Sequence, residues 1–328
     1  MDFGDPEPES REALQGNVMT DLSHGGLIRV TGRDAATFLS GQFTCDVRQV
    51  SGETSRSGAW CTPKGKVIVV FRILRQGDAY HLLLPRELLE STLKRLRMYV
   101  LRADVALADD SDIVTRIGLS GPSITERLAE AGYDPPASPN QARQGAGHTL
   151  VRLFAGPYPC YLFLGEPEAV KSLWQRVGTG ARPVGSSTWD MLEILAGVPT
   201  ILPATAEAFL PQMLNLKELG GISFTKGCYV GQEVVAKLEH LGKLKRRMIL
   251  ASTDTENLPK PGASVFHAGE SVGQVVAAAR HPERKIVLLA VLEKSAMEAT
   301  DLQLEGVPLT LLPLPYPIQD FSATSERS

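Results

Sequence analysis

The chain changes character after Lys243, and this change limits the folds that are open to it. Beyond that residue, short β-prone segments are separated by glycines and prolines at intervals that suit a small antiparallel barrel. The segments are residues 244–250, 263–266, 272–277, 286–291 and 307–312. We therefore expect a C-terminal antiparallel β-barrel domain over residues 243–320.

The preceding part of the chain mixes strands with helices in two units of similar size. The first unit has expected strands at 27–30, 67–71 and 80–84 and a helix that begins after Pro85. It predicts a first α+β domain over residues 21–111, which residues 186–242 could complete. A strand–helix–strand–strand–helix order over residues 112–185 predicts a second, split-βαβ (ferredoxin-like) domain.

The length of 328 residues agrees with this division, because it exceeds what one ordinary core can organise. The expected fold class is therefore α+β, with two α+β domains followed by a barrel. Residues 186–196 between these parts read as a helix, or as a helix followed by a strand.

The composition indicates a globular protein without a bias toward polyanions. The net charge is −3 and the isoelectric point is near 6.1, so nothing marks the whole surface for nucleic acid or anionic lipid. No apolar run reaches the ~18–20 residues that cross a bilayer. The acidic, proline-bearing start resembles neither a secretory signal nor a transit peptide. We expect residues 1–20 to be a disordered tail, and the protein to be a cytoplasmic monomer without membrane contact.

The four cysteines are widely spaced and include no CxxC pair, so we expect no metal site in the isolated chain. Cys160 lies in an apolar segment and is expected to pack in the core. Cys45 and Cys61 are also assigned to packing. Cys228 differs, because its neighbours favour chemistry.

Residues 226–233, with the sequence KGCYVGQE, surround this fourth cysteine. Lys226 precedes Cys228 by two positions, and Gly231 is expected to open a helix over residues 232–241. Unpaired N–H groups and a nearby ammonium favour a thiolate, which lowers the pKa of a cysteine below its free value of roughly 8.5. We interpret Cys228 as a reactive thiolate that faces a ligand-sized cavity. The alternative is a small apolar residue in a tight turn.

The segment 226–233 also carries a family resemblance. Together with residues 211–216, 220–225, 32–47 and 63–66, it closely resembles the YgfZ family. These are folate-binding proteins needed for iron–sulfur enzymes, and they are related to the glycine-cleavage T-protein, an aminomethyltransferase. The resemblance implies a three-domain ring around a central opening that holds tetrahydrofolate or a derivative.

Carried over position by position, the resemblance implies that Lys226 and Cys228 are the catalytic residues. The implied folate-binding residues are Lys226, Gly227, Tyr229, Gly231, Gln232, Glu233, Gln42, Lys64 and Glu193. The residue types agree with such a site. Lysine can meet the glutamate tail of folate, glycine permits close backbone approach, and amide and carboxylate groups match the edge of a pterin. Lys64 could equally face solvent on its turn.

Two departures from the family pattern bear on the chemistry. The T-protein has a catalytic aspartate in the strand that corresponds to residues 67–71, where this chain has no carboxylate. Aminomethyl transfer is therefore not expected. Relatives often have an acidic residue directly before Ala-Gly, where this chain has Leu195, with Glu193 two positions earlier. If the segment is extended, Glu193 shares that face; if it is helical, Glu193 points elsewhere.

The resulting hypothesis is a tetrahydrofolate-binding accessory protein that uses Cys228 in the assembly or repair of iron–sulfur clusters. Its partners would be iron–sulfur client enzymes or cluster carriers. The alternative is a folate-dependent aminomethyl or one-carbon transferase or demethylase. A third hypothesis is a tRNA-associated module that uses the basic run 243–247. That run lacks interleaved aromatics, so a solvated strand face is favoured over RNA contact.

Overall fold

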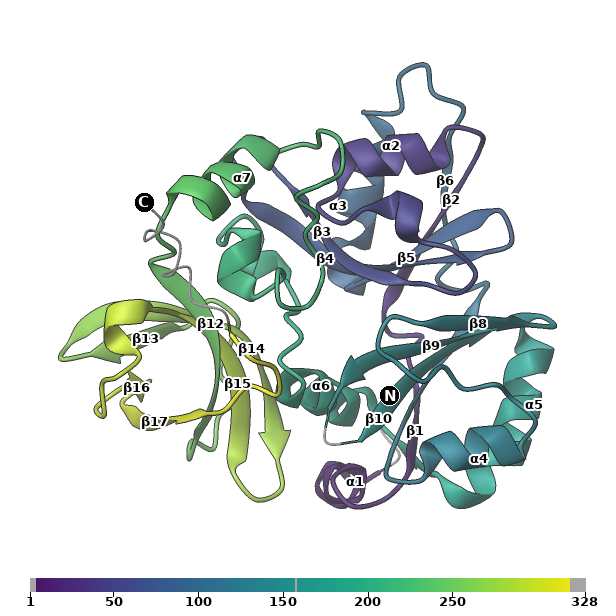
Figure 1. Ribbon diagram of the computed structural model, residues 1–328. Helices are drawn as coiled ribbons and strands as arrows, with labels where there is room; N and C mark the ends of the chain where they lie inside the picture. The colour runs from purple at the N-terminus through teal and green to yellow at the C-terminus, as the bar shows by residue number, and fades with distance from the viewer. Residues whose placement is uncertain (1–3, 157, 319–328) are drawn as a thin grey trace, which may run out of the picture.

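The computed structural model describes residues 4–156 and 158–318. They form two β-sheets with helices packed on them and a closed β-barrel, arranged around a central region (Figure 1). The expected fold class is thereby confirmed. The precise division into domains stays a prediction, because strands of one sheet come from distant parts of the chain. No helix in the described ranges has the length and apolar character needed to span a membrane.

The first sheet has five strands, and every neighbouring pair in it is antiparallel. In sheet order the strands are β3 (Arg56–Cys61), β4 (Val67–Gln76), β5 (Ala79–Leu84), β2 (Gly26–Thr31) and β6 (Ala106–Asp109). Its helices are α2 (Ala35–Gln42) and α3 (Arg86–Arg97). α3 buries leucines at helical spacing and leaves its basic residues outward, which is why this stretch forms an amphipathic helix.

The second sheet has six strands, in the order β11 (Arg182–Val184), β1 (Val18–Asp21), β7 (Thr115–Ser120), β10 (Pro159–Gly165), β9 (His148–Ala155) and β8 (Ala142–Gly145). Alternate residues of β10 divide between two cores. Tyr161 and Phe163 pack in one core with residues of α4 (Ile124–Glu130) and α5 (Pro167–Val177), whereas Leu162 joins the core shared with α6 (Ser186–Leu195). Both faces of this sheet are therefore covered.

The disordered tail expected for residues 1–20 is wrong for the part that the structure describes. A helix, α1 (Pro6–Ala13), precedes β1, and β1 pairs with both β7 and β11. The carboxylate of Glu9 accepts a hydrogen bond of 2.7 Å from the amide of Gly185, at the start of α6. The acidic composition suggested solvation, but this carboxylate instead satisfies a helix N-terminus across the fold.

The C-terminal barrel has the strand order β12 (Arg246–Thr253), β15 (Lys285–Glu293), β14 (Glu270–His281), β13 (Ser264–His267), β16 (Gln303–Leu304) and β17 (Val307–Leu312). β15 alternates between a core inside the barrel and the core shared with the rest of the molecule. α6 packs against β14 and β15, and Figure 1 places this helix between the barrel and the second sheet. The expected helix over residues 232–241 is confirmed as α7 (Gln232–Leu241).

Candidate functional site

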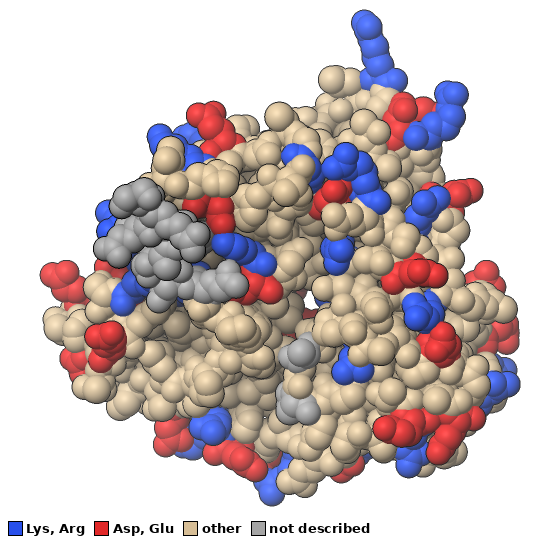
Figure 2. Space-filling view, viewed as in Figure 1, with Lys and Arg blue, Asp and Glu red and all other residues tan. Residues whose placement is uncertain are grey.

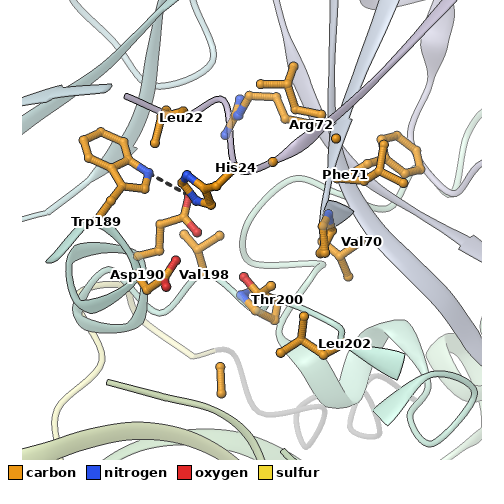
Figure 3. Close-up of a pocket in the computed structure, with 18 of the residues that line it drawn as sticks. Leu22, His24, Val70, Phe71, Arg72, Trp189, Asp190, Val198, Thr200 and Leu202 are labelled. Atoms are coloured by element: carbon orange, nitrogen blue, oxygen red, sulfur yellow. Dashed lines mark hydrogen bonds between the residues drawn. The ribbon is translucent and has the colours of Figure 1, made fainter. Parts of the chain in front are cut away.

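A cavity of about 410 Å³ lies where the three parts of the fold meet (Figure 3). Its lining comes from strands of both sheets, from α3 and α6 with the segment that follows α6, and from the barrel strand β14 and the loop between β12 and β13. This volume is within the range of small-molecule sites, roughly 300–1,000 Å³. The walls are mainly apolar, with a few polar side chains that could orient a ligand.

Glu193 lines this cavity from α6. The indole N–H of Trp189 donates a hydrogen bond of 3.2 Å to Glu193 Oε1, drawn as the dashed line in Figure 3. Burial among protein atoms raises the pKa of the Glu193 carboxyl to about 7, and the nearby Asp190 carboxylate contributes in the same direction. A carboxyl with this pKa exchanges its proton near neutral pH.

The segment that carries Glu193 is helical, so Glu193 and Leu195 lie on different faces, as expected for that case. The face of Glu193 is the one that borders the cavity, and Trp189 and Asp190 line the cavity beside it. Spacings of three and four residues place side chains on the same face of a helix. A carboxylate two positions before Leu195 therefore lines the cavity, and its substitution for the acidic position of the family pattern stays a prediction.

The cavity also brings together three titratable residues that the sequence reasoning missed, namely Asp190, His24 and Glu87. Burial raises the pKa of Asp190, the His24 imidazole opposes this rise, and the Glu87 carboxylate adds to it. The i,i+3 spacing of Asp190 and Glu193 was a usable signal. Nothing local in the sequence connects them to His24 or Glu87, because these lie on other elements.

Arg72 was also missed, and it joins the first two sheets at the cavity wall. Its guanidinium donates to Ser55 Oγ at 2.9 Å, Asn140 Oδ1 at 2.8 Å, Ser57 Oγ at 3.2 Å and the Leu153 carbonyl at 3.1 Å. Burial lowers its pKa to about 10, whereas the Glu193 carboxylate raises it. Four protein acceptors already use this guanidinium, so its main contribution is to hold the walls in place.

The apolar strand identified in the sequence forms another part of the wall. Val70 and Phe71 of β4 line the cavity. They occupy the stretch where the resemblance implied a catalytic aspartate in the T-protein. The acidic groups of this cavity therefore come from α6 and α3, and not from β4.

The segment 226–233 lies elsewhere, between the end of α2 and the start of α7. The amide of Val230 donates to the Gly41 carbonyl at 3.2 Å, and the amide of Ser223 donates to the Thr44 carbonyl at 2.9 Å. The hydroxyl of Thr44 in turn donates to the Gly221 carbonyl at 2.6 Å. These bonds fasten the loop before α7 to the first sheet.

Cys228 is exposed on this loop, whereas Cys45, Cys61 and Cys160 are buried. Its exposure agrees with an accessible thiol. However, Cys228 is not part of the lining of the central cavity. That it faces a ligand-sized space stays a prediction. The bond from the Val230 amide to the Gly41 carbonyl holds this loop on α2, and the thiol is left exposed.

Lys226 is buried and points toward α2. Its ammonium donates to the Ser40 carbonyl at 2.5 Å and lies 4.4 Å from the centre of the Tyr229 ring. Burial lowers the pKa of Lys226 to about 8, although Cys45, Asp46 and Cys228 oppose the shift. The ammonium therefore interacts with the carbonyl end of α2, close to the thiol. Because it is buried there, it is poorly placed to bind the glutamate tail of folate.

Gly231, before the start of α7, packs against Thr62 and Gly65 of the turn 62–66. Gly231 has φ 84°, and a Cβ there would lie 2.5 Å from the Thr62 carbonyl oxygen. Only glycine fits this left-handed, crowded position. Lys64 itself is exposed on the turn.

The remaining predicted residues surround the same loop. Gln232 Oε1 accepts a hydrogen bond of 3.3 Å from the Tyr229 amide, and Glu233 is exposed in the first turn of α7. Gln42 ends α2, and its buried Oε1 has no partner among the described residues. Burial raises the pKa of the Tyr229 hydroxyl. Of all the predicted binding residues, only Glu193 lines the central cavity.

Two arginines of the basic run 243–247 form ion pairs at the start of β12. Arg246 pairs with Glu293 at 2.7 Å, and Arg247 pairs with Glu218 at 3.0 Å with both side chains buried. Arg246 and Arg247 begin β12. The expected strand is confirmed for these two arginines, but the expected solvation is wrong for Arg247, because its ion pair with Glu218 is buried.

Comparison with known proteins identifies relatives along almost the whole chain. The chain is 34% identical over 244 residues to the tRNA-modifying protein YgfZ of Colwellia psychrerythraea, covering 74% of each chain. It is 30% identical over 321 residues to the tRNA-modifying protein YgfZ of Pectobacterium carotovorum subsp. carotovorum, covering 96% of each chain. A search against models of protein families found no match.

The fold has a counterpart among solved structures. The glycine cleavage system aminomethyltransferase T from Bartonella henselae superimposes with a TM-score of 0.71 at 17% identity, over 94% of this chain and 88% of that protein. At this identity the likeness concerns the fold alone. The two YgfZ relatives, one of them matched nearly end to end, decide the family: this chain is a member of the YgfZ family.

Proposed function

We propose that the chain is a tetrahydrofolate-binding accessory protein that supports the assembly or repair of iron–sulfur clusters in client enzymes. The observation that carries the folate part is the central cavity, with a carboxyl group poised near neutral pH on an otherwise apolar wall. The iron–sulfur part comes from the family resemblance. The T-protein fold, which the chain shares, supports a ligand at the ring centre.

The residues of the cavity fit a reduced pterin. The pyrimidine edge of a pterin presents an amino group and a ring N–H side by side, and a carboxylate accepts two such hydrogen bonds in parallel. Glu193 offers this acceptor, and Asp190 on the same helix face offers a second. Apolar side chains such as Phe71 and Leu202 could pack against the faces of the ring. When bound, tetrahydrofolate supplies nitrogen atoms that carry one-carbon units.

The separation between the cavity and Cys228 supports a division of labour. The cavity would bind the folate, and the exposed thiol would act on a partner at the outer surface. Lys226 would position the loop of Cys228 through its bond to the Ser40 carbonyl. Gly231, which lacks a side chain, would allow the loop to pack closely on the turn 62–66 where it leads into α7.

The relatives are named as tRNA-modifying proteins, and we propose that this chain reaches tRNA modification indirectly. An iron–sulfur enzyme that modifies tRNA would be the client, and the chain would maintain its cluster. The ion pairs that engage Arg246 and Arg247 favour this indirect route over direct RNA contact by the run 243–247.

Titration of purified protein with tetrahydrofolate in a calorimeter tests the folate part. Wild-type protein should bind, and Glu193→Gln should bind about tenfold more weakly because an acceptor of a charge-assisted bond is lost. In cells that lack the gene, Cys228→Ala should fail to restore iron–sulfur enzyme activity although it binds folate normally. Full restoration by Cys228→Ala would remove the thiol from the function.

A folate-dependent transferase is the second candidate, and the same carboxyl favours it. Glu193, with a pKa of about 7, could exchange a proton with a bound amine or folate nitrogen. Purified protein with tetrahydrofolate and methylated amines should nevertheless form no methylene-folate. Sustained turnover that is lost in Glu193→Gln would establish the transferase instead.

A further inference from the structure

The turn between α3 and β6 displays apolar side chains to solvent. Met98 is 65% exposed, Tyr99 38% and Leu101 90%. In Figure 1 the chain between α3 and β6 projects from the upper edge of the first sheet, away from the barrel. Three large apolar side chains within four positions differ from the single exposed residues that are normal on protein surfaces.

The same turn carries cations without carboxylates. Residues 94–102, which we term the docking turn, contain Lys94, Arg95, Arg97 and Arg102 and no acidic residue. Arg95 pairs with Glu207 at 3.0 Å, and Arg97 donates to the Leu107 carbonyl at 2.9 Å. Within the described ranges, Lys94, Arg97 and Arg102 have no ion-pair partner. Figure 2 shows Lys and Arg side chains extending from this end of the molecule.

Carboxylates also approach the docking turn from neighbouring elements, but they are fewer than its cations, and one of them, Glu207, is engaged by Arg95. Asp104, which follows the turn, pairs with Arg33 at 2.7 Å. Glu90 is exposed one helical turn before Lys94. The local charge around Met98 and Leu101 therefore stays positive, although the whole chain carries −3.

The docking turn is built into the sheet. The amides of Met98, Tyr99, Val100 and Ala103 all donate to carbonyls three residues earlier. The Tyr99 ring meets the buried Trp60 edge-on at 6.0 Å, and the Arg95 guanidinium lies 5.5 Å from the Trp60 ring centre. Leu101 has φ 45°, a strained conformation for a branched residue. A preformed turn loses little conformational entropy when it binds a partner.

Helix α2 connects this turn with the loop of Cys228. At its start, the Asp34 amide bonds to the Asp104 carbonyl and the Asp34 carboxylate accepts from the Asp104 amide. At its end, the Ser40 carbonyl holds Lys226. The eight residues of α2 span about 12 Å along the axis. A protein seated on the turn could therefore reach the thiol.

From this arrangement we propose that the docking turn is the surface on which the client protein of Cys228 binds, through an apolar pocket bordered by carboxylates. The proposal rests on the proposed function, since it takes the client to be the iron–sulfur enzyme on which the thiol acts. The exposed side chains of Met98 and Leu101 favour a protein as the binding partner over RNA, because an RNA backbone of phosphates offers no apolar surface on which they could be buried. The free cations then require an acidic rim on the partner.

The test measures binding of the purified chain to a purified iron–sulfur enzyme, the one whose activity falls most in cells that lack the gene. Leu101→Gly and the pair Lys94→Glu with Arg102→Glu should each weaken binding about tenfold. Leu101→Gly should keep its melting temperature, since glycine relieves the positive φ. Ile113→Gly, at a residue 66% exposed outside the docking turn, is the matched control and should bind as wild type.

Cys228→Ala separates this proposal from the function on which it rests. It should bind the enzyme as tightly as wild type but fail to sustain its activity. If Cys228→Ala sustains activity while Leu101→Gly loses binding, the thiol function fails and the docking turn stands. If wild-type protein forms no complex, or if the turn variants bind as wild type, the docking proposal is overturned.

Other occupants give different signatures. Salt-sensitive binding of bulk tRNA that is lost on charge reversal but kept in Leu101→Gly would assign the turn to RNA, and this would overturn the proposal. Self-association in sedimentation experiments that is lost in Leu101→Gly would overturn it as well, because a second copy would then cover the surface.

Discussion

The central cavity and the Cys228 loop are built in contrasting ways. The cavity is assembled from two sheets, α6 and the barrel, so its walls come from segments far apart in the sequence. The loop is one continuous segment, fastened by a few backbone bonds to α2 and to the turn 62–66. The contrast teaches that a ligand-sized cavity and an exposed thiol can be formed by separate parts of one fold.

Alkylation of the four cysteines gives the largest expected effect. Cys228 is exposed, whereas burial raises the pKa of Cys45, Cys61 and Cys160 to about 12. In native protein treated with iodoacetamide, Cys228 should react at least ~1,000-fold faster, because thiolate fraction and access both favour it. Peptide mass spectrometry measures the four rates. Comparable rates would mean that the three buried cysteines become accessible through frequent local unfolding. The contrast between the Cys228 loop and the packed interior would then weaken.

Gly231→Ala should disturb the loop and leave the cavity intact. A methyl group there would lie 2.5 Å from the Thr62 carbonyl oxygen at a φ of 84°, so we expect a loss of about 2–3 kcal/mol in the free energy of unfolding. Gly220→Ala is the matched control, because Gly220 also has positive φ but open space around it, and about 1 kcal/mol is expected. Urea denaturation measures both. Equal losses would show that the close approach to the turn is unimportant.

Glu193 should make stability depend on pH. Its pKa rises from 4.5 to about 7 on folding, so between these values the unfolded chain has released a proton that the folded protein keeps. Stability should therefore decrease as pH rises through this window, by at most about 1.4 kcal/mol per pH unit. Thermal melts of wild type and Glu193→Gln from pH 4 to 8 should diverge above pH 4.5, with the variant relatively more stable at pH 8. Parallel curves would show that the carboxyl is solvated and that the cavity is open.

Lys64→Ala should give the smallest effect. Lys64 is exposed on its turn and lies outside the lining of the cavity. Tetrahydrofolate affinity should therefore change less than about twofold, since an exposed charge at a distance is screened by salt. A tenfold loss in calorimetry would connect the outer loop to the ligand site and would end the separation proposed above.

Local signals were sufficient for several elements. Apolar spacing and flanking glycines located α7 from Gln232 to Leu241, and short β-prone segments predicted the barrel. Composition was misleading at the start of the chain, where Glu9 binds the N-terminus of α6. A carboxylate's distant partner cannot be inferred from the residues beside it.

The candidate site shows the same limit. Cys228 could be singled out because its setting is local, and the structure places it on an exposed loop. Glu193 was located in the sequence, but the direction in which it points depends on how α6 packs between the barrel and the second sheet. Asp190, His24 and Glu87 came together only through that packing, since they lie on different elements.

By itself, the sequence determined the barrel and the helix α7 and singled out the thiol of Cys228, because periodicity, turn residues and local motifs act over a few positions. Only the tertiary structure decided that the cavity belongs to Glu193 and not to Cys228. A cavity is the space left between packed elements, and its position depends on long-range contacts that no short segment encodes.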